Sequence, residues 1–342
     1  MTPLMSNVHK IAVIGAGSWG TAIAGILAAK GFKTTLWGHH PDHIAALNRE
    51  RENKKYLPGY HFVDILNLTS DLTVAVQGCD IVCMVVPSHG FRRVFEEVAP
   101  LLENGCQVVS AVKGIENETL MTMTQIMKEV LGARLHGRDI SLAVLSGPSF
   151  AKEVALGMPT AVTIGCSKIE KAQQLQHVFG TERFRIYASN DIIGLEISAA
   201  LKNIVAIAAG ISDGLGYGLN SRAALITRGL AEIKRFGVTM GADPLTFFGL
   251  SGLGDLVLTC TGDLSRNRTV GLKLGQGKKL SSILNEMEMV AEGVKTTRSV
   301  YELALRFNVD MPILHQVYLI LYEEKDCSAA VMDLLTREMK IE

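Results

Sequence analysis

The feature that most constrains the fold of this chain is a glycine fingerprint between an apolar run and a helical segment. Residues 10–37 read as strand, glycine turn, helix and strand, with GAGSWG at residues 15–20 in the turn. In this context Gly15 permits a tight turn, Gly17 lets the backbone approach a pyrophosphate, and Gly20 lets the helix pack against the strand. Backbone N–H groups at the helix start then face the phosphates. The pattern predicts a Rossmann-like βαβ opening that binds a dinucleotide.

The end of the second predicted strand bears on the choice of dinucleotide. NAD-selective sites usually place a carboxylate there to hold the ribose hydroxyls. This chain has Trp37, Gly38 and His39 instead, and its next carboxylate is Asp42. Because His39 or His40 could contact a 2′-phosphate, we expect NADP to be accepted along with NAD. The alternative is that both histidines are solvated loop residues.

Alternating strand and helix patterns continue to about residue 190. Strands are predicted at residues 66–69, 81–85, 107–111, 142–145, 161–165 and 184–187, and helices at 43–50, 72–77, 91–99, 119–130 and 168–179. This alternation predicts an α/β fold with a doubly wound, mostly parallel sheet, whose ligands bind at the carboxyl ends of strands. Lys113 lies in one such turn, where it could reach an anionic substrate. It could equally be a solvated surface charge.

From residue 191 onward the predicted strands stop and apolar residues recur at helical spacing. We therefore expect a dinucleotide-binding domain at residues 1–190 and an all-helical substrate and catalytic domain at residues 191–342. The first helix of the second domain carries Glu196, Lys202 and Asn203 within an apolar run. These polar residues favour a buried helix of a globular protein over a bilayer span.

Lys202 lies at the centre of that apolar helix. Burial disfavours the charged ammonium group and lowers the pKa of a lysine towards the range where it acts as a base. A cation nearby, Lys113 or Arg266, would lower the pKa further, and Asp255 would oppose that drop. The alternative is that the aliphatic stem passes the apolar face and the charge lies in water.

A second polar cluster interrupts the later helices. A glycine-rich segment contains Asp255 and ends in Ser265, Arg266, Asn267 and Arg268. Adjacent hydroxyl, guanidinium and amide donors suit phosphate oxygens. The alternative is a helix start, with Ser265 as its cap and both arginines solvated.

Composition excludes several classes of partner. The formal net charge of this 342-residue chain is zero, which gives no reason to expect nucleic acid or an anionic membrane surface. The amino terminus lacks a hydrophobic signal core, so we expect a cytoplasmic protein without membrane insertion. Its six cysteines form no CxxC pair, and its clustered histidines (39, 40 and 43) have no ligand partners nearby in sequence. We therefore predict reduced thiols and no metal site.

Short motifs from both predicted domains resemble those of bacterial NAD(P)-dependent glycerol-3-phosphate dehydrogenases. In order they are GAGSWGTA, VVPS, VKGIE, LSGPSFAKEVA, LKNIVAIAAGISDGLG, RAALITRGLAE, GLGDLVLTCT, SRNR and AEG, and they extend over nearly the whole chain. The resemblance implies an oxidoreductase that interconverts sn-glycerol 3-phosphate and dihydroxyacetone phosphate by hydride transfer with NAD(P). It also implies supply of glycerol 3-phosphate for glycerophospholipid synthesis, and a homodimer.

The resemblance assigns roles to individual residues. Lys202 matches the family's proton acceptor. The residues that match its glycerol phosphate contacts are Lys113, Gly147, Ser149, Lys202, Asp255, Ser265, Arg266 and Asn267. Those that match its cofactor contacts, beside Gly15, Gly17 and Gly20 of the fingerprint, are Ser18, Trp19, His39, Lys113, Ala151, Arg266, Val290 and Glu292.

Two other functions remain open from the sequence. One is a related reductase that acts on another hydroxy acid or sugar acid, although the donor cluster and paired lysines suit a small phosphate ester better. The other is a redox-sensing protein that binds NAD(H) without turnover, which would give no reason for a lysine in an apolar helix.

Overall fold

The structure is a computed structural model that describes residues 8–134, 137–287, 291–339 and 341. Its contacts divide the chain into two compact units. The first contains the residues before Lys113 together with Met121–Leu195. The second contains Lys113–Leu120 and the residues from Glu196 onward.

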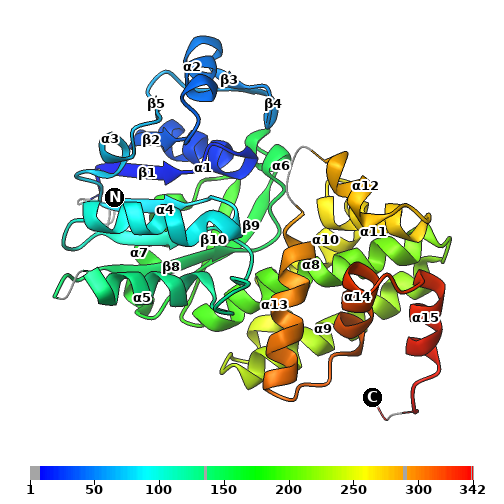
Figure 1. The fold of residues 1–342 in the computed structure, drawn as a ribbon. Coiled ribbons are helices and arrows are strands. Elements are labelled where there is room, and N and C mark those ends of the chain that lie inside the picture. Colours follow the sequence, from blue (N-terminus) through cyan, green and yellow to red (C-terminus); the bar gives the residue numbers. More distant parts are fainter. Residues whose placement is uncertain (1–7, 135–136, 288–290, 340, 342) are drawn as a thin grey trace. The chain divides into compact units, whose positions relative to one another are not determined.

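An eight-stranded sheet forms the centre of the first unit (Figure 1). Its strands are β1 (Lys10–Ile14), β2 (Lys33–Trp37), β5 (Asn67–Thr69), β6 (Ile81–Met84), β7 (Gln107–Ser110), β8 (Ser141–Ser146), β9 (Thr160–Cys166) and β10 (Phe184–Ser189). They lie in the order β10-β9-β8-β7-β6-β1-β2-β5. Every neighbouring pair is parallel except β8 and β9. The mostly parallel sheet that the sequence predicted is confirmed.

Helices pack on both faces of this sheet. One face is covered by α1 (Ser18–Ala29), α2 (Pro41–Glu50), α6 (Ala151–Ala155) and α7 (Ile169–Phe179), and the other by α3 (Leu72–Val76), α4 (Phe91–Val98) and α5 (Met123–Arg134). Within β1, Ile11 and Val13 join the core of the first face, whereas Ala12 and Ile14 join that of the second. This alternation follows from the two-residue period of a strand and confirms the doubly wound arrangement.

Three local features differ from the prediction. A two-stranded hairpin of β3 (Glu52–Asn53) and β4 (Leu57–His61) and the short helix α6 were not foreseen. Helix α5 was predicted from residue 119 but begins at Met123. Leu120 has a φ of +61°, and a right-handed helix cannot pass through a residue in this left-handed conformation.

From residue 196 onward the second unit consists of helices and their connections, with no strand among its described residues, as predicted. Its helices are α8 (Ile192–Gly214, which begins in the first unit), α9 (Leu219–Thr239), α10 (Asp255–Thr261), α11 (Arg266–Gly275), α12 (Leu280–Asn285), α13 (Glu292–Arg306), α14 (Pro312–Tyr322) and α15 (Cys327–Leu335). A short 3₁₀ turn (Thr246–Phe248) and a π-helical turn (Leu250–Gly254) precede α10.

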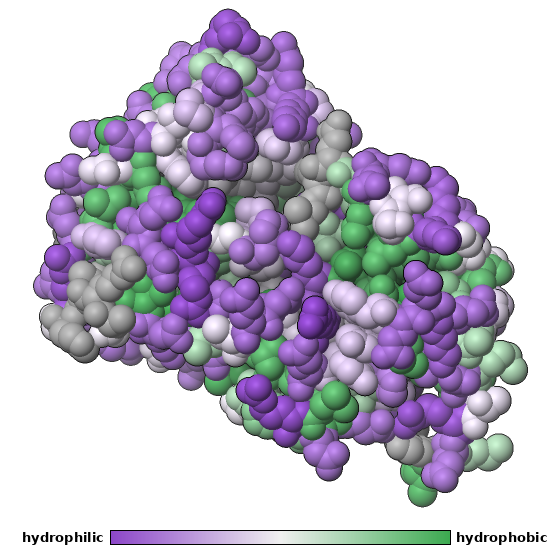
Figure 2. Space-filling view, viewed as in Figure 1, coloured by the Kyte–Doolittle hydropathy of each residue, from purple (hydrophilic) through white to green (hydrophobic). Residues whose placement is uncertain are grey.

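Helix α8 is long and apolar enough to cross a membrane, with a mean hydropathy of 1.7, but 94% of that apolar stretch is buried inside the protein. Its composition is therefore that of a core helix. The molecular face in Figure 2 is mostly hydrophilic, with apolar patches scattered between polar side chains.

Residues 113–120 belong to the helical unit although they lie in sequence between β7 and α5 of the sheet unit. Two side-chain contacts join this segment to the helical unit. The Lys113 ammonium lies 2.8 Å from Asp255 Oδ2, and the Ser299 hydroxyl donates a hydrogen bond to Asn117 Oδ1. The helical unit is therefore assembled from two separate stretches of sequence.

Helices α8 and α11 cross with their backbones in contact at four glycines. A Cβ added at Gly210 would lie 2.1 Å from a carbonyl oxygen of α11, and one at Gly271 would lie 2.0 Å from a carbonyl oxygen of α8. Gly214 and Gly275 meet the facing backbone in the same way. Only glycine allows this close approach, which fixes the helix that carries Lys202 against the helix that begins at Arg266.

Replacing Gly271 with alanine is expected to lower the free energy of unfolding by about 1–3 kcal/mol, because the two backbones must separate to admit the methyl group. The midpoint of urea unfolding measures this loss. Gly132→Ala on α5 is the matched control, since among the described residues none lies within 4 Å of an added Cβ there. Equal midpoints for the two variants would contradict the close crossing.

Candidate active site

The glycine turn at the start of α1 has the shape that a pyrophosphate needs. Gly15 has a φ of +125°, and its Cβ would lie 2.8 Å from Val85 O. A Cβ at Gly20 would lie 1.9 Å from Gly15 O, so these two positions require glycine. At Gly17, in contrast, an added Cβ would meet none of the described residues within 4 Å. This open space beside the first N–H groups of α1 fits a phosphate.

The hairpin of β3 and β4, which the sequence did not predict, is hydrogen-bonded to the glycine turn. Asn53 Nδ2 donates to Ala16 O at 3.0 Å, and the Ser18 hydroxyl donates to Tyr56 O at 2.5 Å. Trp19 packs edge-on against Phe184 of β10, with ring centroids 6.3 Å apart. Ser18 and Trp19 therefore both lie at the glycine turn, where the cofactor contacts were predicted.

His39 and His40 follow β2 and are both exposed. Their ring centroids lie 3.5 Å apart. Burial lowers the pKa of His39, and the neighbouring His40 and Arg93 charges lower it further. His39 is therefore a neutral imidazole at pH 7, able to donate one hydrogen bond but carrying no charge.

The predicted contacts after β8 lie together in the first unit. Gly147 has a φ of +141°, and an added Cβ would lie 2.9 Å from Val162 Cα. The Ser149 hydroxyl donates to Gly147 O at 3.0 Å, and Ala151 begins α6. The backbone at Gly147 therefore depends on glycine.

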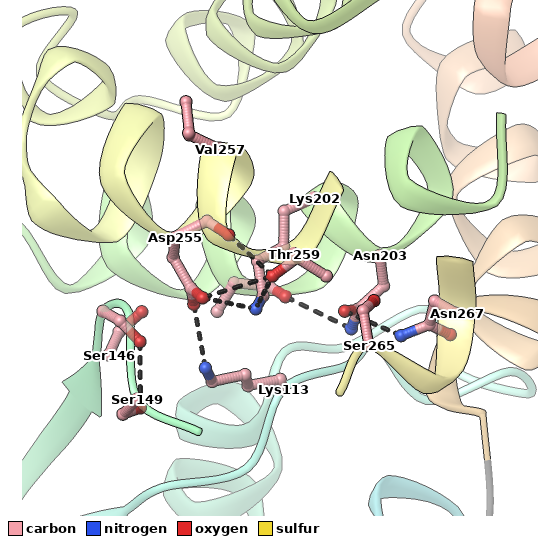
Figure 3. A network of polar contacts seen from close by, with 12 residues as sticks. Lys113, Ser146, Ser149, Lys202, Asn203, Asp255, Val257, Thr259, Ser265 and Asn267 are labelled. Carbon is pink, nitrogen blue, oxygen red and sulfur yellow. Dashed lines mark hydrogen bonds and ion pairs between the residues drawn. The ribbon is translucent and has the colours of Figure 1, made fainter. Parts of the chain in front are cut away.

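The second unit brings Lys113, Lys202 and Asp255 into one buried cluster (Figure 3). Lys202 is only 5% exposed, and its Nζ lies 2.6 Å from Asp255 Oδ1. Asp255 is 1% exposed, and its other oxygen receives Lys113 Nζ at 2.8 Å. The interpretation of Lys202 as a solvated lysine is wrong, and so is that of Lys113 as a lone surface charge.

The electrostatics of the cluster favour proton transfer by Lys202. Burial lowers the pKa of Lys202 to about 7, Asp255 opposes this shift, and Lys113 adds to it. Burial alone would raise the pKa of Asp255, but the charges of Lys113 and Lys202 outweigh it and hold that pKa below its ordinary value. Asp255 therefore stays ionised while Lys202 exchanges a proton near neutral pH.

Thr259 completes the cluster and was missed from the sequence. Its hydroxyl donates to the backbone carbonyl of Asp255 at 2.6 Å, and its oxygen accepts from Lys202 Nζ at 2.7 Å. Asp255 and Thr259 are four residues apart on α10, so both side chains lie on one face of that helix. That spacing is the signal which could have identified Thr259.

Ser265 caps α11, as one of the two interpretations of this cluster held. Its side chain accepts a hydrogen bond from Arg268 N at 3.2 Å. Arg268 is not solvated, because its guanidinium binds Asp213 at 2.8 Å and Asp263 at 2.9 Å. Arg268 therefore ties α11 to the end of α8 rather than facing solvent.

Arg266 and Asn267, which lie between Ser265 and Arg268, have different surroundings. Asn267 is buried, donates to Asn203 Oδ1 at 2.9 Å, and accepts from Gly293 N at 2.9 Å, so it joins α8, α11 and α13. Arg266 is exposed by surface area, yet the packing around its guanidinium lowers its pKa, and the charge of Glu292 opposes that shift. Val290, a predicted cofactor contact, lies outside the described residues.

A Rossmann-like sheet with this glycine turn, in a chain that also has a buried lysine of near-neutral pKa, defines a dinucleotide-dependent dehydrogenase. Two family profiles specify it further. Residues 10–172 match the N-terminal part of NAD-dependent glycerol-3-phosphate dehydrogenase, and residues 191–332 match its C-terminal part. The chain belongs to the NAD-dependent glycerol-3-phosphate dehydrogenase family.

Individual relatives are similar to this chain over 99% or more of their own length. The chain is 59% identical over 339 residues to a glycerol-3-phosphate dehydrogenase (NAD(P)+) of Desulfotalea psychrophila, covering 99% of this chain and 100% of the relative. It is 54% identical to one of Citrifermentans bemidjiense, covering 98% and 99%. The crystal structure of glycerol-3-phosphate dehydrogenase from Coxiella burnetii is similar, with a TM-score of 0.92, 41% identity, and coverage of 96% of this chain and 99% of that one.

Proposed function

We propose that this protein interconverts sn-glycerol 3-phosphate and dihydroxyacetone phosphate with NAD(P) as hydride carrier. The observation that carries the proposal is the buried Lys202, held by Asp255 and with a pKa of about 7. We further propose that it acts in the cytoplasm as a homodimer and supplies glycerol 3-phosphate for glycerophospholipid synthesis. Membership of the family supports these assignments.

We assign the two functions to two parts of the chain. Residues 1–190 bind the dinucleotide, with its pyrophosphate at the turn formed by Gly15, Gly17 and Gly20. Residues 191–342 provide the catalytic lysine and the substrate donors, and Lys113 acts with them. The open space at Gly17 supports the first assignment, and the Lys113–Asp255 pair supports the second.

When bound, the nicotinamide accepts or supplies the hydride at C2 of the substrate. The protein must move the hydroxyl proton, and we assign that step to Lys202 Nζ. Asp255 and Thr259 fix the direction of this nitrogen, which reduces the reorganisation needed when the proton moves. The positive charge of Lys113 stabilises negative charge that develops on the substrate oxygen.

The phosphate of the substrate is assigned to Ser265, Arg266 and Asn267. We expect Arg266→Gln to raise the KM for dihydroxyacetone phosphate by about 10- to 100-fold, because it removes one charge-assisted hydrogen bond. Steady-state kinetics measure the change. Arg298→Gln is the control, since Arg298 is an exposed residue of α13 that pairs only with Glu302 among the described residues. An unchanged KM in the Arg266 variant would remove it from the phosphate site.

An absorbance assay of NAD(P)H consumption with dihydroxyacetone phosphate tests the function directly. Consumption that requires dihydroxyacetone phosphate, and is much slower with 2-keto acids or keto sugar acids, is the expected result. Faster turnover of one of those other substrates would indicate the related reductase. Binding of NAD(P)H without turnover of any substrate would indicate a redox sensor.

A further inference from the structure

Three loops meet around the glycine turn of the sheet unit. Gly15 N donates to Trp37 O at 2.9 Å, which joins the turn to the end of β2. Val85 N donates to Ile14 O at 2.8 Å, and a Cβ on Gly15 would lie 2.8 Å from Val85 O. The segments that follow β2 and β6 therefore flank the glycine turn on its two sides.

The side chains of these segments share one core. Trp37, at the end of β2, is buried in the same apolar cluster as Phe91 and Phe95 of α4. The Trp37 ring lies 6.4 Å from the His39 ring, centroid to centroid. Arg93 lies on α4 between the two phenylalanines and is exposed. Its positive charge reaches His39, where it adds to the effects of burial and of His40 in lowering the imidazole pKa.

Arg93 and its neighbour Arg92 have different electrostatic surroundings. Arg92 points to α5, where its Nη1 lies 2.5 Å from Glu129 Oε1. Arg93 has no ion-pair partner within the part of the chain that the structure describes. The charge of Arg93 is therefore available to bind an anion. The charge of Arg92 is already paired with Glu129.

A 2′-phosphate needs a permanent cation beside the end of β2. The strand ends without a carboxylate that would repel this phosphate, and His39 is neutral because its pKa is lowered. An arginine remains charged at any physiological pH and binds phosphate through two parallel N–H groups. In this chain no arginine lies among residues 38–43, directly after β2, whereas Arg93 lies in the first turn of α4, which follows β6.

We propose that Arg93 of α4 determines the preference for NADP by binding the 2′-phosphate of the adenosine ribose, with His39 as a hydrogen-bond donor beside it. The proposal rests on the proposed use of NAD(P) and names the residue that distinguishes its two forms. Arg93 acts on cofactor choice and takes no part in the chemical step.

Isothermal titration calorimetry with 2′,5′-ADP and with 5′-ADP tests this role without any turnover. Arg93→Gln is expected to weaken binding of 2′,5′-ADP by about 10- to 100-fold and that of 5′-ADP by less than about threefold. In the enzyme assay, the same variant should raise the KM for NADPH by a similar factor and leave the KM for NADH and kcat nearly unchanged.

Arg92→Gln is the matched control, because it removes the same charge one residue away and should not alter the ratio of the two affinities. His39→Ala should give a smaller loss than Arg93→Gln, since it removes a neutral donor. Equal weakening of both nucleotides by Arg93→Gln would overturn the proposal. So would a wild-type protein that binds 2′,5′-ADP no better than 5′-ADP. Failure to oxidise NAD(P)H with dihydroxyacetone phosphate would refute the proposed function and leave these binding results interpretable.

Discussion

Replacing Lys202 with methionine is expected to lower kcat by about 10²- to 10⁴-fold, the usual contribution of a positioned acid or base. Methionine keeps an unbranched apolar stem in the core and removes only the ammonium group. Asp255 retains Lys113 as a partner, so its carboxylate does not become an isolated buried charge. The loss should therefore fall on the chemical step, with the KM for both substrates changed much less.

The pH dependence gives a second signature of Lys202. In reduction of dihydroxyacetone phosphate the lysine must carry the proton, so kcat should fall as the pH rises through about 7. In oxidation of glycerol 3-phosphate the lysine must be neutral, so kcat should rise over the same range. The Lys202→Met variant should lose this dependence in both directions.

Lys278→Met is a suitable control for this substitution. Lys278 is an exposed residue that pairs with Glu286 at 3.1 Å, and its loss should leave kcat unchanged. Circular dichroism and thermal unfolding establish that each variant is folded. A folded Lys202→Met protein with kcat within tenfold of the wild type would show that another group moves the proton.

Replacing Asp255 with asparagine is expected to lower the free energy of unfolding by about 3–5 kcal/mol, because Lys113 and Lys202 lose the buried carboxylate between them. Urea unfolding measures the loss. Asp333→Asn is the control, since Asp333 pairs with Lys325 at the exposed surface and should contribute about 0–1 kcal/mol.

The difference between wild type and Asp255→Asn should depend on pH. Without the carboxylate, the pKa of Lys202 falls below about 7, so the folded variant binds fewer protons than the folded wild type just below that pH. The stability difference therefore widens as the pH falls from about 7 to about 5. In reduction, the kcat profile of the variant should move to lower pH. A stability difference that narrows over this range would contradict the role of Asp255 as the counter-ion of Lys202.

Much of the fold could be predicted because its signals are local. The apolar runs, the glycine turn and the helical spacing of β1, α1 and β2 lie within 28 consecutive residues. The hairpin was missed because β3 has two residues and β4 contains Pro58 and Gly59, which give no alternating pattern. The antiparallel direction of β9 depends on how its connection packs, and a strand's own residues do not encode that direction.

The candidate site was predicted as a set of residues rather than as a geometry. Lys202 lies 53 positions from Asp255, and Lys113 lies 142 positions from it, so no spacing rule could bring them together. The resemblance to a family assigned all three residues to the substrate site, and the structure adds the distances between them and their burial. Thr259 and Arg93 were not identified because a threonine on a helix and an arginine next to another arginine are both common in sequences.

The assignment of residues 113–120 to the helical unit has a consequence for dissecting this protein into fragments. A gene piece that encodes residues 196–342 alone would omit Lys113 and Asn117, and with them one of the two cations that neutralise Asp255. The carboxylate would then have Lys202 as its single lysine partner, and the loss of the second cation would raise the pKa of Lys202. A truncated protein of this kind would be a poor stand-in for the catalytic half of the intact enzyme.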